Sequence, residues 1–220
     1  MKSSKPFAFV LWVKDERLPL YLAERVKMMT HFDYFHWIHH KAEKEPKAII
    51  KKASKQPPKQ HWHCVLHFRK ATDYEMILRG FISLWAKEHP EYGEMPFTFA
   101  RTHEGKVNNL CTWLAYVIHD PRYMAFIESK CDKPESHKHS YDWNSIKSTD
   151  YDLLNLQVQN AVSFVDKCEK TVRDFEDAKE RGFDSPRLSD ALGHCSNYHQ
   201  MLVAGAMWKA ARIDESGVIQ

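Results

Sequence analysis

Hydrophobic and polar positions alternate along one short stretch of the chain, from Gln60 to Phe68. Successive side chains of a β-strand point to opposite faces of its sheet. The alternation therefore predicts a strand with one apolar face and one face that carries histidines. The apolar face would present Trp62, Cys64, Leu66 and Phe68, and the other face would present His61, His63, Val65 and His67.

The rest of the first 150 residues shows a regular succession of strand and helix patterns. Short apolar or alternating runs predict further strands at residues 7–13, 34–40, 97–101 and 138–143. Helical spacing predicts helices at residues 19–29, 72–87 and 110–119, and Thr72 and Glu75 have the spacing of a capping box. This order predicts an α+β fold with a ferredoxin-like, split βαβ antiparallel sheet and flanking helices.

From about residue 150 the apolar spacing becomes that of one long helix, which is expected to end near Gly182. A second helical segment is expected after Pro186. No residue pattern in this part points to catalysis, and such helices more often mediate assembly. We therefore expect an α+β domain over residues 1–147 and an all-α helical domain for oligomerisation over residues 148–220.

Charge is unevenly distributed along the chain. The 220 residues are 43% hydrophobic, which is enough for a buried core, and the formal net charge is +3. Residues 1–149 contain 24 Lys and Arg against 17 Asp and Glu, a net charge of +7, and the remainder carries −4. Twelve of the 14 histidines also precede residue 150. A basic, histidine-rich first part is typical of a module that binds or cleaves a polyanion.

The cysteines and the hydropathy predict a cytoplasmic protein without a membrane partner. The five cysteines are an odd number and form no Cys-x-x-Cys pair, so a disulfide framework is not expected. The N-terminal apolar run is too short for a signal peptide, and no run of roughly 18 apolar residues occurs.

His61 and His63 are candidate metal ligands, because two imidazoles on one strand face can hold one ion. The alternative without a metal is that both are half-exposed polar positions of an ordinary strand. His39, His40 and Glu43 lie at the end of the preceding predicted strand, which would be the antiparallel neighbour of the first. The sequence does not decide whether His39 or His40 joins the site with Glu43.

Tyr116 is the candidate nucleophile, with His119 one turn later on the same face of the predicted helix. Its alternative role is that of a core aromatic residue. Tyr92 and Tyr123 are rival nucleophiles, but each closely follows a proline and neither has a histidine at this spacing.

Residues 41–59 contain seven lysines against two glutamates and are expected to form a basic loop. Such a loop either is simply solvated or contacts phosphates. The candidate DNA-binding residues are Lys51, Lys52, Lys55 and Lys59 of this loop, together with His119.

In combination these motifs resemble the plasmid rolling-circle replication initiators of the HUH endonuclease superfamily. His61-Trp62-His63 matches the superfamily's His-hydrophobe-His metal motif, and residues 114–119 are similar to its tyrosine motif. Residues 38–43 are similar to its Leu-His-Asp-Lys-Asp element, and residues 138–142 resemble its closing strand. An ungapped match places Ala42 at the carboxylate position, whereas a shift of one residue pairs His40 with Glu43.

The resemblance implies a metal-dependent enzyme that nicks and rejoins single-stranded DNA at a plasmid origin to start rolling-circle replication. Attack by Tyr116 would give a 5′-phosphotyrosyl intermediate, with Mn²⁺ or Mg²⁺ as the cofactor. The implied partners are plasmid origin DNA, double-stranded and as an exposed single strand, the host replication machinery, and further copies of the chain in a homo-oligomer such as a hexamer.

Three alternatives stay open from the sequence. The first is a relaxase or transposase-type nuclease of the same superfamily. The second is a DNA-binding repressor with this fold and no catalytic activity. The third is a metal-dependent hydrolase unrelated to nucleic acid.

Overall fold

The computed structural model describes residues 3–13, 16–41, 60–92, 97–99, 105–128 and 140–180. The chain divides into two compact units. The sheet unit comprises residues 1–110 and 142–157, and the second unit comprises residues 111–141 and 158–220. The predicted boundary between residues 147 and 148 stays a prediction, because residues 181–220 lie outside the described residues.

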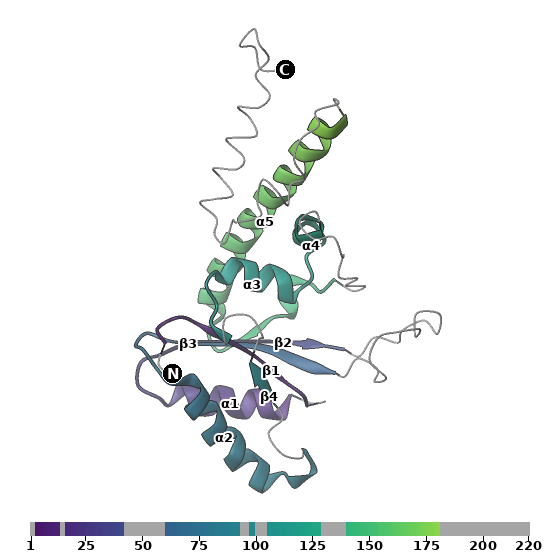
Figure 1. Ribbon diagram of the computed structural model, residues 1–220. Helices are drawn as coiled ribbons and strands as arrows, with labels where there is room; N and C mark the ends of the chain where they lie inside the picture. Colours follow the sequence, from purple (N-terminus) through teal and green to yellow (C-terminus); the bar gives the residue numbers. More distant parts are fainter. Residues whose placement is uncertain are drawn as a thin grey trace, which may run out of the picture. The chain divides into compact units, whose positions relative to one another are not determined.

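The sheet unit is built on a five-stranded sheet with the strand order β4-β1-β3-β2-β5 (Figure 1). All four pairs of neighbouring strands are antiparallel, which confirms the predicted α+β class with an antiparallel sheet. The strands are β1 (Phe7–Leu11), β2 (Phe32–His40), β3 (His61–Phe68), β4 (Phe97–Phe99) and β5 (Lys147–Ser148).

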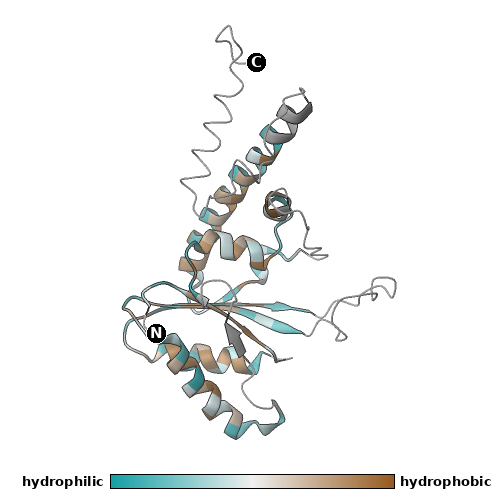
Figure 2. Cartoon of the chain, in the orientation of Figure 1, coloured by the Kyte–Doolittle hydropathy of each residue, from teal (hydrophilic) through white to brown (hydrophobic). Residues whose placement is uncertain are grey.

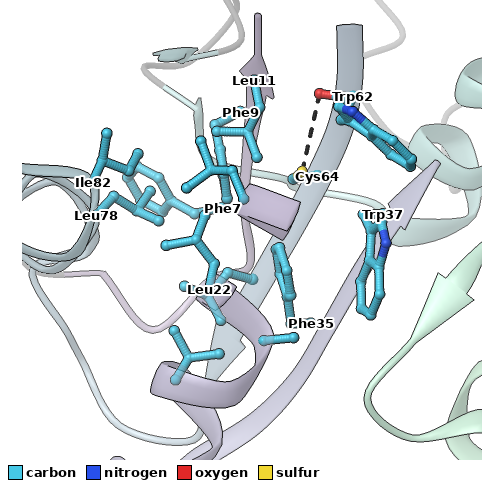
Figure 3. Packing of buried hydrophobic residues seen from close by; sticks show 14 of the residues in the cluster. Phe7, Phe9, Leu11, Leu22, Phe35, Trp37, Trp62, Cys64, Leu78 and Ile82 are labelled. Atoms are coloured by element: carbon cyan, nitrogen blue, oxygen red, sulfur yellow. Dashed lines mark hydrogen bonds between the residues drawn. The ribbon is translucent and has the colours of Figure 1, made fainter. Parts of the chain in front are cut away.

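Two helices, α1 (Arg17–Lys27) and α2 (Tyr74–Glu88), cover one face of this sheet (Figure 1). Both carry hydrophobic and hydrophilic residues side by side, as Figure 2 shows, so each can bury one stripe. Leu22 of α1 and Ile82 of α2 meet Phe9, Phe35 and Cys64 of the strands in a single core (Figure 3). Burial of each such large side chain stabilises the fold by roughly 1.5–3 kcal/mol.

The start of α2 differs from its prediction by one residue. Asp73 is the N-cap, and its carboxylate accepts a hydrogen bond from the backbone N–H of Met76 at 3.2 Å. Glu75 instead pairs with Arg79 one turn later, and the Thr72 hydroxyl donates to the Lys70 carbonyl. An aspartate next to the predicted threonine is an equally good cap, so sequence preference alone could not choose between them.

The predicted closing strand at residues 138–143 is misplaced. Residues 138 and 139 lie outside the described part, and residues 143–145 form a short 3-10 helix that Asp142 caps through the N–H of Asn144 at 2.7 Å. The strand itself, β5, comes later and pairs with His36 and Trp37 of β2. The aspartate favours a local turn over an extended chain at this position.

The structure describes three further α-helices, whose residues lie mostly in the second unit. They are α3 (Leu110–Val117), α4 (Pro121–Glu128) and α5 (Tyr151–Glu180). Helix α5 confirms the predicted long helix, and residues 151–157 at its start belong to the sheet unit. The helical segment predicted after Pro186 lies outside the described residues.

His36 joins β2 to β5 and to the first turns of α5 inside the sheet unit. Its side chain is 0% exposed, with Nδ1 2.8 Å from the Ser148 hydroxyl and Nε2 2.7 Å from the Gln157 side chain. The Ser148 hydroxyl also donates to the Asp150 carbonyl at 2.7 Å. Burial lowers the pKa of His36 to about 4, although Gln157 and Asp150 act in the opposite direction.

We predict that His36 makes the fold sensitive to acid. Its pKa is about 4 in the folded chain against an ordinary 6.5, so the unfolded chain binds more protons between these values. Its contribution to stability is therefore complete above pH 6.5 and is lost as the pH falls towards 4. The expected loss of unfolding free energy is roughly 3 kcal/mol. Urea unfolding of wild type and His36→Gln across this range should show a shallower pH dependence in the variant, and parallel curves would contradict the assignment.

Candidate metal centre

The pairing of β2 with β3 brings three histidines to one end of the sheet. His40 lies opposite His61, and Ile38 lies opposite His63. On β3 the intervening residues Trp62 and Cys64 are 5% and 0% exposed in the core beneath α1 and α2, so the histidines point to the other face. This is the alternation expected from the sequence.

Side chains of His40, His61 and His63 form a compact cluster. One ring nitrogen of each can be chosen so that all three lie within 4.8 Å of one another. The Nε2 atoms of His61 and His63 are 3.1 Å apart, and the His40 ring centroid is 4.4 Å from that of His63. His40 is 5% exposed, and the other two are half-buried.

This geometry fits a divalent metal ion. Nitrogens about 2.1 Å from one ion lie roughly 2.9–3.4 Å apart for bond angles between 90° and tetrahedral. The 3.1 Å separation of the His61 and His63 nitrogens falls within that range. Three imidazoles with no described carboxylate among them form a nitrogen-rich site, which suits transition metals better than it suits Mg²⁺.

His39 lies on the opposite face of β2 from this cluster. Its ring stacks on Trp62 with 4.3 Å between centroids and 22° between planes. Its Nε2 is buried and has no hydrogen-bond partner among the described residues. Burial, followed by the charge of Lys41, lowers the pKa of His39. Of the two histidines that the sequence left open, the structure brings His40 to the cluster and places His39 against the core.

The predicted carboxylate ligand and the basic loop lie outside the described residues. These residues are Glu43, Lys51, Lys52, Lys55 and Lys59. Their predicted roles in metal and phosphate binding stay predictions.

His67 shares the face of His61 and His63, but it makes its hydrogen bonds at the other end of β3. Its Nδ1 is 2.8 Å from the Asp33 carboxylate, and its Nε2 is 3.2 Å from the Ser4 carbonyl. Burial acts to raise the pKa of Asp33, but hydrogen bonds from Arg69 and His67 outweigh it and lower that pKa. His67 therefore holds the sheet to the N-terminal segment.

Tyr116 and His119 lie together in the second unit, at the end of α3. Their ring centroids are 6.1 Å apart in an edge-to-face arrangement. His119 has φ of 50°, and the N–H groups of His119 and Asp120 bond back to the carbonyls of Tyr116 and Ala115. These two bonds and the left-handed residue form a Schellman motif that ends α3. His119, proposed from sequence as a DNA contact, is 9% exposed and ends the helix.

Asp120 connects the end of α3 to the start of α4. It accepts a hydrogen bond from the N–H of Arg122 at 2.9 Å, and Pro121 occupies the first helical position, which lacks an N–H to satisfy. The Arg122 guanidinium bridges Asp120 at 3.0 Å and Asp166 of α5 at 2.5 Å. This bridge ties α4 to α5 within the second unit.

The rival nucleophile Tyr123 is held by packing. Its ring lies 6.4 Å from that of Phe126 and 5.8 Å from that of Phe164, and burial raises its pKa. A raised pKa disfavours the phenolate form of Tyr123. The side chain of Tyr92 lies outside the described residues.

The sequence analysis missed one residue beside the cluster, Trp12, whose ring centroid is 5.1 Å from that of His61. The continuous apolar run at residues 7–13, read as a strand, puts Trp12 on one face with Ala8 and Val10. It gives no information on which strand pairs with which, so nothing in the pattern placed this face beside His61.

Neither a scan against known protein families nor a search of curated proteins found a match to this chain. The resemblance to the rolling-circle initiators therefore rests on the motifs of the sequence alone.

The predicted partners require a correction. Plasmid origin DNA, the host replication machinery and a homo-oligomer were expected, but the comparisons support none of them as a partner. We withdraw all three. Within the described part of the chain, no helix combines the length and apolar character that crossing a membrane requires. A cytoplasmic location stays a prediction.

We predict that His61→Ala and His63→Ala each weaken binding of Co²⁺ or Mn²⁺ by more than about 10- to 100-fold, because each removes one direct ligand. His39→Ala is the matched control, since it removes the histidine adjacent to His40 on the other face. Isothermal titration calorimetry with the full chain measures the metal affinity of these variants and of the control. Equal loss in His39→Ala and His63→Ala would contradict the site.

We also predict that the left-handed backbone conformation limits which residues position 119 tolerates. Left-handed φ is tolerated by Asn and disfavoured in β-branched residues. His119→Asn should therefore unfold at a higher urea concentration than His119→Val, by an amount equivalent to roughly 1–2 kcal/mol. Equal midpoints would show that φ at this position is not maintained.

Proposed function

We propose that this chain is a metal-dependent enzyme that nicks and rejoins single-stranded DNA through a 5′-phosphotyrosyl intermediate, as in plasmid rolling-circle replication. The observation that carries the proposal is the cluster of His40, His61 and His63 on two paired strands. The sequence motifs His61-Trp62-His63 and residues 114–119, which include Tyr116, indicate the reaction class. DNA enters here only as the substrate of the reaction.

The order of elements in the sheet unit supports the proposal. From β1 to β4 the chain runs strand, helix, strand, strand, helix, strand, and β1 and β3 are the inner two of these four strands. We propose that this is a ferredoxin-like, split βαβ module. We further propose that α5 begins an all-α helical domain at the C-terminal end.

The metal would be held by the three imidazoles, with open coordination positions for substrate oxygens. When bound, Mn²⁺ or Mg²⁺ supplies Lewis-acid polarisation of the scissile phosphate. Because the described ligands of the site are all nitrogen, we expect Mn²⁺ to bind more tightly than Mg²⁺. His40, which is almost fully buried, would fix the position of the site against the sheet.

Tyr116 would attack the phosphorus through its phenolic oxygen. The new tyrosine–phosphate bond forms as the bond to the 3′ oxygen breaks, and the departing 3′ oxygen takes up a proton to become a free hydroxyl. The 5′ phosphate then remains on Tyr116. Since the phosphotyrosyl ester conserves the energy of the broken bond, attack by a 3′ hydroxyl reverses the step and rejoins the strand.

We predict that incubation of wild type with Mn²⁺ and supercoiled plasmid DNA gives open circles and a protein–DNA band that survives denaturation. Tyr116→Phe should reduce both by roughly three orders of magnitude or more, because it removes the attacking oxygen. Tyr123→Phe is the matched control and should retain both products.

Each contrary result would exclude a different part of the proposal. Nicking by Tyr116→Phe without a covalent band would indicate attack by water, and the metal-dependent hydrolase alternative would replace the proposal. Binding of the DNA without nicking by wild type would favour the repressor. Persistence of nicking in His63→Ala would remove the metal site from the mechanism.

A further inference from the structure

Trp12 lies at the edge of the metal centre with a large part of its side chain in solvent. It is 44% exposed, and its ring is tilted by 44° against that of His61 at 5.1 Å between centroids. The last pair of β1 and β3 is Leu11 with Trp62, so Trp12 continues the register opposite His61. Trp12, the residue after β1, thus lies next to His61, which in turn pairs with His40.

The exposure of Trp12 distinguishes it from the tryptophans that stabilise the sheet unit. Trp37, Trp62 and Trp85 are 4–5% exposed and belong to the core cluster. The adjacent Val13 is 2% exposed, so the chain does bury an apolar side chain at this point. An indole that is 44% exposed beside a polar cluster contributes little to the core, and its solvent-exposed surface can contact a flat ligand.

We infer that Trp12 is a stacking platform for a nucleobase of the DNA strand whose phosphate is positioned at the histidine cluster. The inference rests on the proposed function. A base is attached to the same sugar–phosphate unit as its phosphate, so one nucleotide can reach both the cluster and the neighbouring indole. Stacking accepts any base, because every base has an aromatic face. Trp12 would therefore add affinity and orient the strand, and would not read its sequence.

The test compares two single-stranded probes of equal length in Mn²⁺, a short oligothymidylate and a strand in which every nucleotide is abasic. Fluorescence anisotropy gives the Kd of each probe for the full-length wild type, Trp12→Ala, Trp12→Phe and Tyr151→Ala. Tyr151 is the matched control, because it is an exposed aromatic residue at the start of α5 (56% exposed).

We expect Trp12→Ala to weaken binding of the oligothymidylate by about 5- to 150-fold, the range for loss of one stacked base. Its Kd for the abasic strand should stay at the wild-type value. Trp12→Phe should recover part of the loss, and Tyr151→Ala should match wild type. Calorimetric Mn²⁺ binding should be the same in wild type and Trp12→Ala, which excludes damage to the histidine cluster.

Three results would overturn the inference, and two of them leave the proposed function intact. Unchanged oligothymidylate binding by Trp12→Ala, or an equal loss on both probes, would show that Trp12 does not stack on a base while the nicking proposal stands. Failure of wild type to bind either probe would overturn the proposed function, and the inference with it.

Discussion

The pairing of β2 with β3 is the constraint on which the sheet unit and its candidate site depend. It sets Trp37 opposite Cys64 in the core and His40 opposite His61 at the end of the ladder. Because side chains alternate, burying Trp62 and Cys64 under the helices forces His61 and His63 to the other face. A slip of one residue would exchange every side chain between the two faces. Hydrophobic burial on one side of the sheet thus determines which polar side chains face the other side.

The same face of β2 carries two histidines in contrasting environments. His36 is enclosed, and both of its ring nitrogens lie within hydrogen-bonding distance of neutral side chains, those of Ser148 and Gln157. His40 instead faces two further imidazoles, whose nitrogens present lone pairs when deprotonated. Neutral hydrogen-bonding partners are typical of a structural histidine, whereas several converging lone pairs require a proton or a cation between them. Partner chemistry therefore separates the two roles more clearly than burial does.

Local sequence pattern predicted much of this fold. The features that depend on pairing between distant segments could not be predicted from it. The β3 alternation and the long α5 were predictable, because each follows from side-chain periodicity within one element. The choice of His40 over His39 was not predictable, since it depends on which of two adjacent residues faces the core. Trp12 was missed for a related reason: its position beside His61 follows from the β1–β3 register, which no local pattern encodes.

The adjacent histidines of β2 show how closely two different requirements can be interleaved in a strand. His39 packs on Trp62, so its substitution would alter the shape of the apolar layer. His40 belongs to the histidine cluster, so its substitution would alter the ligand set. Although the two residues are neighbours and chemically identical, natural selection would act on them through separate traits. Position 39 would accept other flat, partly apolar side chains, while under the proposed function position 40 would accept only residues that coordinate a metal.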